Sequence, residues 1–324
     1  MTVHPELLTE FQRASLPVQE QVALATLGSF QLGGPAASVV TVRSANEMAL
    51  AQKILHKSTE SAVLIGEGTN ILFSDEGWNG ILIRSVDALE CPEASSPQKV
   101  RVPAALNLEK LVDWAIEHEL SGLEPFVGIP GTVGGAVVGN AGAWGVQMAD
   151  RLTLVSGWTP QGEAFTWRTD ECGFEYRNST LKEQGYWVSE VTFSLEAGDQ
   201  GKLLSEKERV LAEREARHPE WRSTPCIGSF FKNLEPSSAA GRRRAAGWFL
   251  EEAGAKDCRV RGAAVFPKHA NILIKKTQDC RASDVAELAA QIQKRVKEVH
   301  GIDLEREVRY LGSFPGESER DGFW

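Results

Sequence analysis

The stretch GIPGTVGGAVVGNAGAWG, residues 128–145, holds seven glycines in 18 positions. A backbone with so few Cβ atoms lets successive N–H groups approach a phosphate oxygen closely and form a concave anion site. Tight packing of strands and turns explains the same composition, and glycine content alone hardly separates the two interpretations. The stretch therefore predicts either a phosphate-binding loop or a compact strand-and-turn segment.

A second glycine segment, VLIGEGTN at residues 63–70, carries an apolar run into two glycines. A dinucleotide-binding Rossmann loop needs GxGxxG at the start of a long helix, with an acidic residue roughly 20 positions later. Here Ile71 takes the place of the third glycine, and the following LFSDEGWNG has no helical period. A Walker loop is excluded because no GK[ST] follows. Taken alone, the segment predicts a strand that ends in a glycine turn.

The composition is that of an ordinary globular protein. With 324 residues and 42% hydrophobic content, the chain can bury a core and is long enough for two or three domains. Its 35 basic and 44 acidic side chains leave a net charge of −9, so the overall charge gives no support to a nucleic-acid partner. An anionic ligand therefore needs a local cluster of basic residues.

The cysteines and the N-terminus predict a cytoplasmic protein. The cysteines are odd in number and lack a CxxC pair or a histidine at zinc spacing, so we predict no metal and a reducing compartment. The opening MTVHPELLTEFQ lacks the apolar core of a signal peptide, and no apolar run reaches membrane-spanning length. We therefore expect no membrane partner. The cysteines are Cys91, Cys172, Cys226, Cys258 and Cys280.

Helix and strand signals occur in both halves of the chain, which indicates an α+β protein. Capping boxes predict helices that begin after Ser44 and after Ser205, and an apolar stripe predicts a helix between Ser283 and Gly301. The charged helix at residues 203–217 marks the start of a separate C-terminal domain. Six runs rich in β-branched residues predict strands: ASVVTVR, AVLIG, GILIRS, LTLVSGW, WVSEVTF and NILIKK.

A series of ordered motifs resembles the UDP-N-acetylenolpyruvoylglucosamine reductase family. GEGTNILFSDEGWNG resembles the family's GGGSNLLVSDEG loop, and residues 128–145 resemble its GIPGTVGGAxxxNAGAYG loop. The motifs FQLGGPA, YRNS, GSFFKN, KHAN and LEREVRYLG follow the family's order, so the resemblance spans roughly Leu24 to Gly312. Glu67 departs from the family's glycine, and its carboxylate should point away from a bound pyrophosphate.

The resemblance implies an α+β fold of the vanillyl-alcohol-oxidase (PCMH) type, with two FAD-binding subdomains at residues 1–85 and 86–200. A C-terminal α+β substrate-binding domain would follow at 201–324. VLIGEGTN would then cradle the pyrophosphate of FAD, and the longer glycine stretch would surround the flavin side. The implied cofactor-binding residues are Gly66, Gly68, Thr69, Asn70, Gly131, Thr132, Gly134, Gly135, Asn140 and Gly142.

The implied reaction is the NADPH-dependent reduction of UDP-N-acetylglucosamine enolpyruvate to UDP-N-acetylmuramate through FAD, in peptidoglycan precursor synthesis. Hydride delivery to the methylene carbon pushes negative charge onto the adjoining carbon and carboxylate. Such charge needs preplaced cations or hydrogen-bond donors, which act more strongly in a dry site than in water. The implied partners are therefore the small-molecule substrate and NADPH, and the oligomeric state is left open.

Three residues match the family's catalytic groups. Arg177 in YRNS matches its catalytic arginine, Glu307 in LEREVRYLG its glutamate beside the substrate carboxylate, and Ser229 in GSFFKN its proton donor. An ionised Glu307 would repel the developing charge, so we predict that it is neutral or compensated by Arg177. Without the resemblance, these residues are interpreted as a strand-end arginine, a solvated glutamate and a small strand residue.

The substrate contacts implied by the resemblance are less specific. They are Lys232, Asn233, His269, Asn271 and Arg309. Bound water and Lys232 are candidates to resupply protons to Ser229, and Lys232 is the weaker one because a side chain three residues along a strand points to the opposite face. His269 could equally be a core histidine. Of the run Arg242–Arg244, we assign at most one residue to ligand binding. Little spare length separates YRNS from GSFFKN, so the chain resembles the shorter type of the family, without the inserted tyrosine loop.

Two other functions remain open on these residues. One is a different flavin-dependent oxidoreductase on the same fold, such as an alcohol oxidase, which would share the glycine loops but lack the SFFKN and LEREV motifs. The other is a noncatalytic flavin-binding module. The presence of Arg177, Ser229 and Glu307 disfavours both alternatives.

Overall fold

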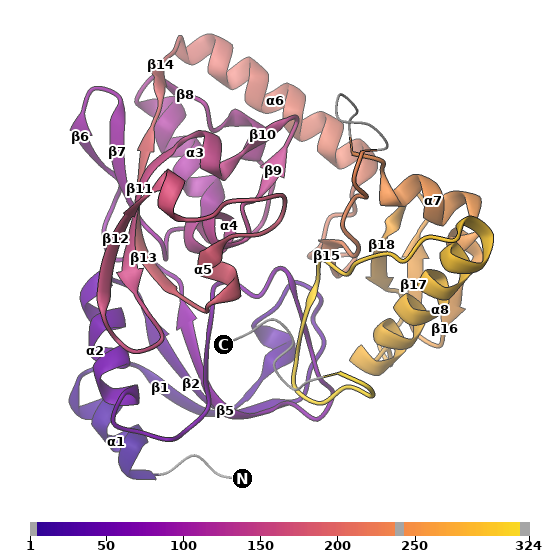
Figure 1. Ribbon diagram of the computed structural model, residues 1–324, viewed down its shortest axis with the longest axis horizontal. Coiled ribbons are helices and arrows are strands. Elements are labelled where there is room, and N and C mark those ends of the chain that lie inside the picture. Colours follow the sequence, from indigo (N-terminus) through magenta and orange to yellow (C-terminus); the bar gives the residue numbers. More distant parts are fainter. Residues whose placement is uncertain (1–4, 237–242, 318–324) are drawn as a thin grey trace.

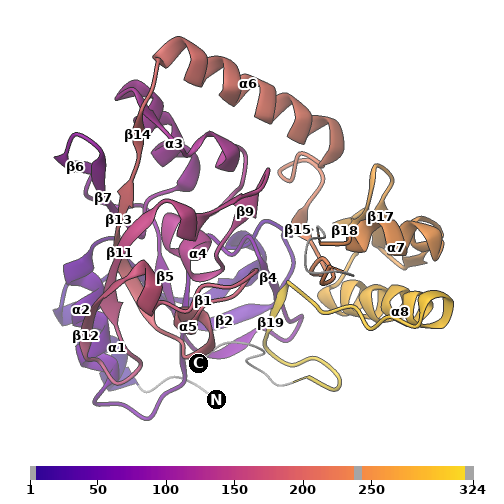
Figure 2. The same cartoon turned by 45° about the horizontal axis from the view of Figure 1, so that its top comes forward.

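The computed structural model describes residues 5–236 and 243–317. The chain folds into three units, each built on its own sheet (Figure 1). The first unit is drawn in indigo and purple, the second in magenta, and the third in orange and yellow. Helix α6 (Gln200–Arg217) runs along the top of the second unit toward the third, as Figure 2 shows from another side.

The first unit carries a four-stranded sheet and two helices, α1 (Pro5–Arg13) and α2 (Ala45–Leu55). Helix α2 begins at Ser44, as predicted, because the Ser44 hydroxyl accepts a hydrogen bond from the Glu47 N–H at 3.1 Å. The three neighbouring strands β2, β5 and β3 run parallel. The strands in spatial order are β1 (Val18–Ala23), β2 (Pro35–Val42), β5 (Trp78–Ser85) and β3 (Ala62–Ile65).

The second unit is an antiparallel five-stranded sheet covered by helices α3 (Leu108–Glu117) and α4 (Val133–Val138), with the short helix α5 (Thr180–Glu183) beside it. Its core is continuous from the sheet to these helices. The strands in spatial order are β12 (Ala164–Arg168), β11 (Leu152–Trp158), β13 (Trp187–Ser194), β7 (Lys99–Pro103) and β6 (Glu93–Ser96).

Helix α6 differs from its prediction in two ways. It begins at Asp199, whose carboxylate accepts from the Lys202 N–H, whereas Ser205 lies inside the helix. The predicted boundary at residue 201 also groups α6 with the C-terminal domain. In the structure, Leu203 and Val210 belong to the core of the second unit, and Arg214 Nε donates to the Val127 carbonyl at 3.0 Å. The physical boundary therefore follows α6.

The third unit packs helices α7 (Ala246–Glu252) and α8 (Ala282–His300) on a four-stranded antiparallel sheet. Helix α8 ends at Gly301, which has the left-handed φ of 67° expected of a C-terminal glycine. Its N-cap is Arg281, not the predicted Ser283. The strands in spatial order are β15 (Cys226–Ser229), β18 (His269–Lys275), β17 (Ala263–Phe266) and β16 (Arg259–Val260).

A final strand returns the chain to the first unit. Strand β19 (Arg309–Leu311) pairs in parallel with β4 (Ile71–Phe73), directly after the glycine turn at residues 66–70. Leu72 and Tyr310 are buried together with the core of the third unit, so this pairing joins the two units. The remaining short elements are β8 (Leu120–Ser121), β9 (Gly142–Ala143), β10 (Val146–Gln147), β14 (Glu196–Ala197), η1 (Leu24–Thr26), η2 (Glu124–Phe126), η3 (Met148–Asp150), η4 (Thr169–Glu171) and η5 (Ala255–Asp257).

Within residues 5–236 and 243–317, none of the helices has both the length and the apolar character that crossing a membrane requires.

Candidate active site

The two glycine segments meet face to face. A Cβ at Gly66 would lie 2.4 Å from Thr132 Oγ1, and a Cβ at Gly131 would lie 2.8 Å from Thr69 Oγ1, so neither position has room for a side chain. Thr69 Oγ1 also donates to the Pro130 carbonyl at 3.0 Å. At each of these contacts, a glycine of one segment faces a threonine side chain of the other. The glycine backbone without Cβ atoms suits an anion bound through N–H groups. These residues fit the pyrophosphate of a cofactor such as FAD.

Several of the predicted cofactor residues already have protein partners. The Gly134 N–H donates to the Ala104 carbonyl at 2.9 Å, and the Thr132 hydroxyl caps α4 by accepting from the Gly135 N–H. Asn140 is fully buried, donates to the Glu175 carbonyl at 2.8 Å and accepts from a backbone N–H. This geometry favours a positioning role for these residues over direct cofactor contact.

Glu67 stands where the family has a glycine, and its carboxylate is bonded to the N-cap residue of a neighbouring helix. Asn107 caps α3, and its Nδ2 donates to Glu67 Oε1 at 2.8 Å. The carboxylate is thus anchored at the start of α3 by an amide donor.

Arg177 and Glu307 meet although they lie 130 positions apart in the sequence. Arg177 Nε lies 3.0 Å from Glu307 Oε1, and their side chains are 23% and 18% exposed. A second guanidinium nitrogen of Arg177 donates to the Gly142 carbonyl at 2.8 Å, which places the pair against the glycine-rich stretch. This geometry agrees with the predicted compensation of Glu307 by Arg177.

Backbone contacts fix Glu307 between the first and third units. Its N–H donates to the Phe230 carbonyl at 2.9 Å, and its carbonyl accepts from Asn70 Nδ2 at 3.3 Å. The Arg309 N–H in turn donates to the Asn70 carbonyl at 3.1 Å. The turn that would hold the pyrophosphate therefore also holds the segment that carries the glutamate.

Burial raises the pKa of Glu307, while Arg177 and Lys182 oppose that rise. The carboxyl group thus has both features that we predicted as alternatives, since its environment favours the neutral form and a guanidinium compensates the ionised one. Burial thus favours the neutral carboxyl group and the nearby cations favour the ionised one. A carboxyl group in such surroundings can lie beside a reaction that generates negative charge.

Ser229 ends strand β15, next to the segment that carries Glu307. The following residue, Phe230, accepts the Glu307 N–H and donates its own N–H to the Asn271 carbonyl. The Asn271 side chain accepts from the Phe231 N–H at 2.9 Å and donates to the Phe231 carbonyl at 2.8 Å. Because Asn271 is 2% exposed and both ends of its amide are used, the geometry favours a positioning role over the predicted substrate contact.

Comparisons with known proteins identify the family of this chain. A model described as FAD binding domain matches residues 36–168, and one described as UDP-N-acetylenolpyruvoylglucosamine reductase, C-terminal domain, matches residues 219–311. The UDP-N-acetylenolpyruvoylglucosamine reductase of Carboxydothermus hydrogenoformans is 35% identical over 302 residues, which cover 93% of this chain and 96% of the relative. This chain belongs to the UDP-N-acetylenolpyruvoylglucosamine reductase family.

Further reductases extend the match across nearly the whole chain. The Treponema denticola reductase is 34% identical over 310 residues, covering 90% of this chain and 92% of its own. The crystal structure of the Thermus caldophilus reductase has a TM-score of 0.72 at 30% identity and covers 91% of this chain and 99% of its own. The predicted α+β fold, an FAD-binding part of the vanillyl-alcohol-oxidase type with a C-terminal reductase domain, is confirmed.

Two of the predicted substrate contacts of this reductase-family chain, Lys232 and Asn233, line a cavity of about 780 Å³, whereas His269 and Arg309 do not. Tyr176 and Asn178, the neighbours of Arg177 in the sequence, line the same cavity. Lys232 Nζ forms a close ion pair with Glu305, and the Asn233 N–H donates to the Tyr176 hydroxyl at 3.2 Å. The cavity therefore lies between the two motifs that carry Arg177 and Ser229.

Of the arginine run, Arg243 and Arg244 line this cavity, whereas Arg242 lies outside the described residues. The Arg243 guanidinium stacks 3.8 Å from the centroid of the Tyr176 ring, and Arg244 lies over Phe249. Neither residue is helical. Arg243 is the member of the run that the geometry favours as a ligand contact.

His269 and Tyr186 have structural surroundings. Burial lowers the pKa of His269, whose ring lies 5.4 Å from that of His218, so the geometry favours a core histidine. Tyr186, the tyrosine between YRNS and GSFFKN, packs with Phe165 and Trp167. Its ring is thus committed to the second unit and does not close the site.

Sequence reasoning missed Lys182, which lies beside the Arg177–Glu307 pair. Its Nζ donates to the Arg177 carbonyl at 3.1 Å, and its own carbonyl accepts from the guanidinium of Arg309. The signal was available in YRNSTLK, because Ser179 is a helix N-cap and one helical turn brings the lysine back over the arginine. In the described residues, no cluster of three or more His, Cys, Asp or Glu side chains could hold a metal ion.

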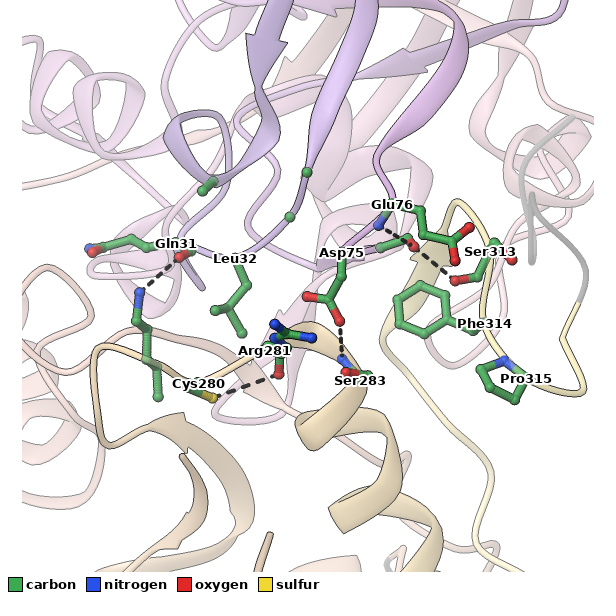
Figure 3. A pocket seen from close by; sticks show the side chains of 15 residues that line it. Gln31, Leu32, Asp75, Glu76, Cys280, Arg281, Ser283, Ser313, Phe314 and Pro315 are labelled. Atoms are coloured by element: carbon green, nitrogen blue, oxygen red, sulfur yellow. Dashed lines mark hydrogen bonds between the residues drawn. The ribbon is translucent and has the colours of Figure 1, made fainter. Parts of the chain in front are cut away.

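A cavity of about 840 Å³ lies elsewhere, between the first unit and the start of α8 (Figure 3). Gln31, Asp75 and Arg281 are among its lining residues, and none of the predicted site residues is. Figure 3 shows Asp75 pointing toward Ser283, whose N–H donates to that carboxylate at 2.9 Å. This cavity marks a junction between units rather than the reductase site.

Proposed function

We propose that this chain catalyses the NADPH-dependent reduction of UDP-N-acetylglucosamine enolpyruvate to UDP-N-acetylmuramate, a step of peptidoglycan precursor synthesis. The observation that carries the proposal is the Arg177–Glu307 pair, 3.0 Å apart and held against the glycine segments of an FAD-binding domain. The matched reductases over most of the chain support the same reaction. Bound FAD supplies hydride acceptance from NADPH and hydride donation to the enolpyruvyl group.

Within this reaction, Arg177 binds the substrate carboxylate. Its planar guanidinium suits a carboxylate. The ion pair with Glu307 and the hydrogen bond to the Gly142 carbonyl fix the orientation of that guanidinium. As negative charge builds on the carboxylate, an already oriented guanidinium stabilises it without reorganisation. Glu307 keeps that guanidinium in place, and in its neutral form it can donate a hydrogen bond to the same charge.

Ser229 donates the proton that C2 of the substrate receives. A hydroxyl is a weak acid at neutral pH, so it needs a partner that stabilises the charge left behind or replaces the proton. Lys232 is the nearest cation in sequence, and its side chain is only 16% exposed. The pair Lys232–Glu305 beside the cavity is the candidate source of that proton.

The substrate's nucleotide part has a place in the cavity between the two motifs. Asn233, Arg243 and the Tyr176 ring line it, so it offers an amide, a cation and an aromatic face. We place the reaction in the cytoplasm. The five cysteines are free, which supports a reducing compartment, and NADPH is a cytoplasmic reductant.

Turnover tests the proposal directly. We expect purified protein to be yellow and to oxidise NADPH under anaerobic conditions only when the enolpyruvyl substrate is present. NADPH oxidation that is equally fast with oxygen alone would identify an oxidase, and bound flavin without NADPH oxidation would identify a binding module. Product formation can be followed by the mass gain of two hydrogens in the substrate.

A further inference from the structure

Lys182 occupies a position that the surrounding structure specifies closely. It lies in the single-turn helix α5, whose N-cap Ser179 is buried and accepts from the Lys182 N–H at 3.1 Å. The Ser179 hydroxyl also donates to the Val138 carbonyl at 2.7 Å, and Leu181 is fully buried. The helix is therefore anchored on α4 of the FAD-binding part, and Lys182 is turned back toward Arg177.

The backbone of Arg177 explains why such an anchor is needed. Its φ of 56° lies in the left-handed region, which is unfavourable for a residue with a Cβ and is often found at functional sites. Lys182 Nζ donates to the Arg177 carbonyl at 3.1 Å, while the Arg177 guanidinium donates to Gly142. Bonds at the two ends of the same residue thus hold this conformation.

Charge around Lys182 gives a second, independent argument. The charged groups that act on its ammonium are Arg309, Lys232, Glu307 and Glu305. With Arg177, which pairs with Glu307, the cluster contains four cations and two carboxylates. The two surplus positive charges match a substrate carboxylate that becomes a dianion when hydride arrives. Without Lys182, the surplus would fall to one.

We infer that Lys182 is a positioning residue for enolpyruvyl reduction, which holds Arg177 in its left-handed conformation and supplies part of the surplus positive charge beside the Arg177–Glu307 pair. The inference rests on the proposed reductase function, because the charge that Lys182 stabilises arises in that reaction. It gives the YRNSTLK segment a role that extends beyond its arginine.

The protonation state of Lys182 supplies a readout that a purely structural lysine would not give. Burial, followed by the charges of Arg309 and Lys232, lowers the pKa of Lys182 to about 8, while Glu307 and Glu305 act in the opposite direction. The ammonium is therefore mostly charged at neutral pH and loses its charge as the pH rises through this value. Enolpyruvyl reduction should decline over the same range.

The test compares Lys182→Met and Lys182→Arg with the wild type, starting from FAD-loaded enzyme reduced by dithionite and mixed with the enolpyruvyl substrate. We expect Lys182→Met to lower the reoxidation rate roughly tenfold or more and to abolish the decline near pH 8. Lys182→Arg should recover part of the rate and move the decline upward, because arginine stays charged. Lys294→Met, an exposed lysine of α8, should match the wild type.

A wild-type rate and pH profile in Lys182→Met would overturn the inference. If that variant fails to retain FAD, the profile of Lys182→Arg decides instead, and an unchanged decline contradicts the role. Failure of the proposed function looks different, since the wild type itself would then show no reoxidation by the enolpyruvyl substrate.

Discussion

The surroundings of Asn140 and Asn271 favour a positioning role in the site over contact with a ligand. Each is buried and has both ends of its amide bonded to the protein, Asn140 between Ala149 and Glu175, and Asn271 around Phe231. Removing such an amide would leave buried backbone groups unsatisfied, at a cost of about 1–3 kcal/mol each. A motif thus identifies residues that matter, but the partners of a buried amide are visible only in the folded chain.

The role proposed for Ser229 concerns only the second half-reaction, the reduction of the enolpyruvyl group. We expect Ser229→Ala to leave FAD reduction by NADPH nearly unchanged and to slow enolpyruvyl reduction by about 10²-fold to 10⁴-fold, because only the second step needs a proton at C2. Rapid-mixing absorbance of the flavin measures both steps.

The matched control is Ser205→Ala, which removes an exposed hydroxyl on α6 and should leave both rates as they are. An equal loss in the two half-reactions of Ser229→Ala would instead assign the serine to structure or to ligand binding alone.

At the scale of elements, helix starts were the least predictable feature. The capping box at Ser44 was sufficient to predict the start of α2, because the residues that form it are neighbours in the sequence. Helix α8 differs, since the carboxylate of Asp75, in the loop after β4, accepts from the N–H groups of Ala282 and Ser283 at 2.8 and 2.9 Å. A cap supplied by a distant loop leaves no pattern in the neighbouring sequence, which is why Ser283 was wrongly chosen.

Asp75→Ala should therefore lower the free energy of unfolding by about 1–2 kcal/mol, through the loss of two N-terminal bonds and of a favourable charge at the start of α8. Urea denaturation followed by circular dichroism measures this difference. Glu76→Ala is the control, because it removes the exposed carboxylate of the adjacent residue. The bond of Glu76 to Ser74 is made by its backbone N–H and is kept in this variant. Equal stability of the two variants would show that the bond between Asp75 and α8 contributes little.

At the scale of the whole molecule, α6 and the final strand connect the three units. Helix α6 packs on the second unit, and His218 at its end contacts His269 of the third. The pairing of β19 with β4 returns the C-terminal segment to the first unit. The Arg177–Glu307 pair lies where these connections bring the units together, so its geometry depends on all three.

The contact between His218 and His269 predicts how stability depends on pH. Burial lowers the pKa of His218 to about 4 from a usual value of 6.5, and it also lowers the pKa of His269. Because the folded state resists protonation, this contribution to stability is complete above pH 6.5 and is lost as the pH falls from 6.5 toward 4. Thermal melting should show a declining midpoint over this window.

The variant His218→Gln should flatten part of that decline, with His269 responsible for the remainder. His56→Gln, which replaces an exposed histidine after α2, should keep the wild-type slope. A slope unaffected by His218→Gln would mean that other groups govern the acid sensitivity of the fold.

The sequence by itself determined what depends on neighbouring residues and on the order of motifs: the glycine turns, the cap at Ser44, the α+β class and the reductase family. It also predicted Arg177, Ser229 and Glu307 as the catalytic residues. Only the tertiary structure decided that the Arg177 guanidinium and the Glu307 carboxylate lie 3.0 Å apart and that Asp75 caps α8. These contacts join residues from separate units. They follow from how the sheets pack and how β19 pairs with β4, and no local periodicity in the chain encodes such distances.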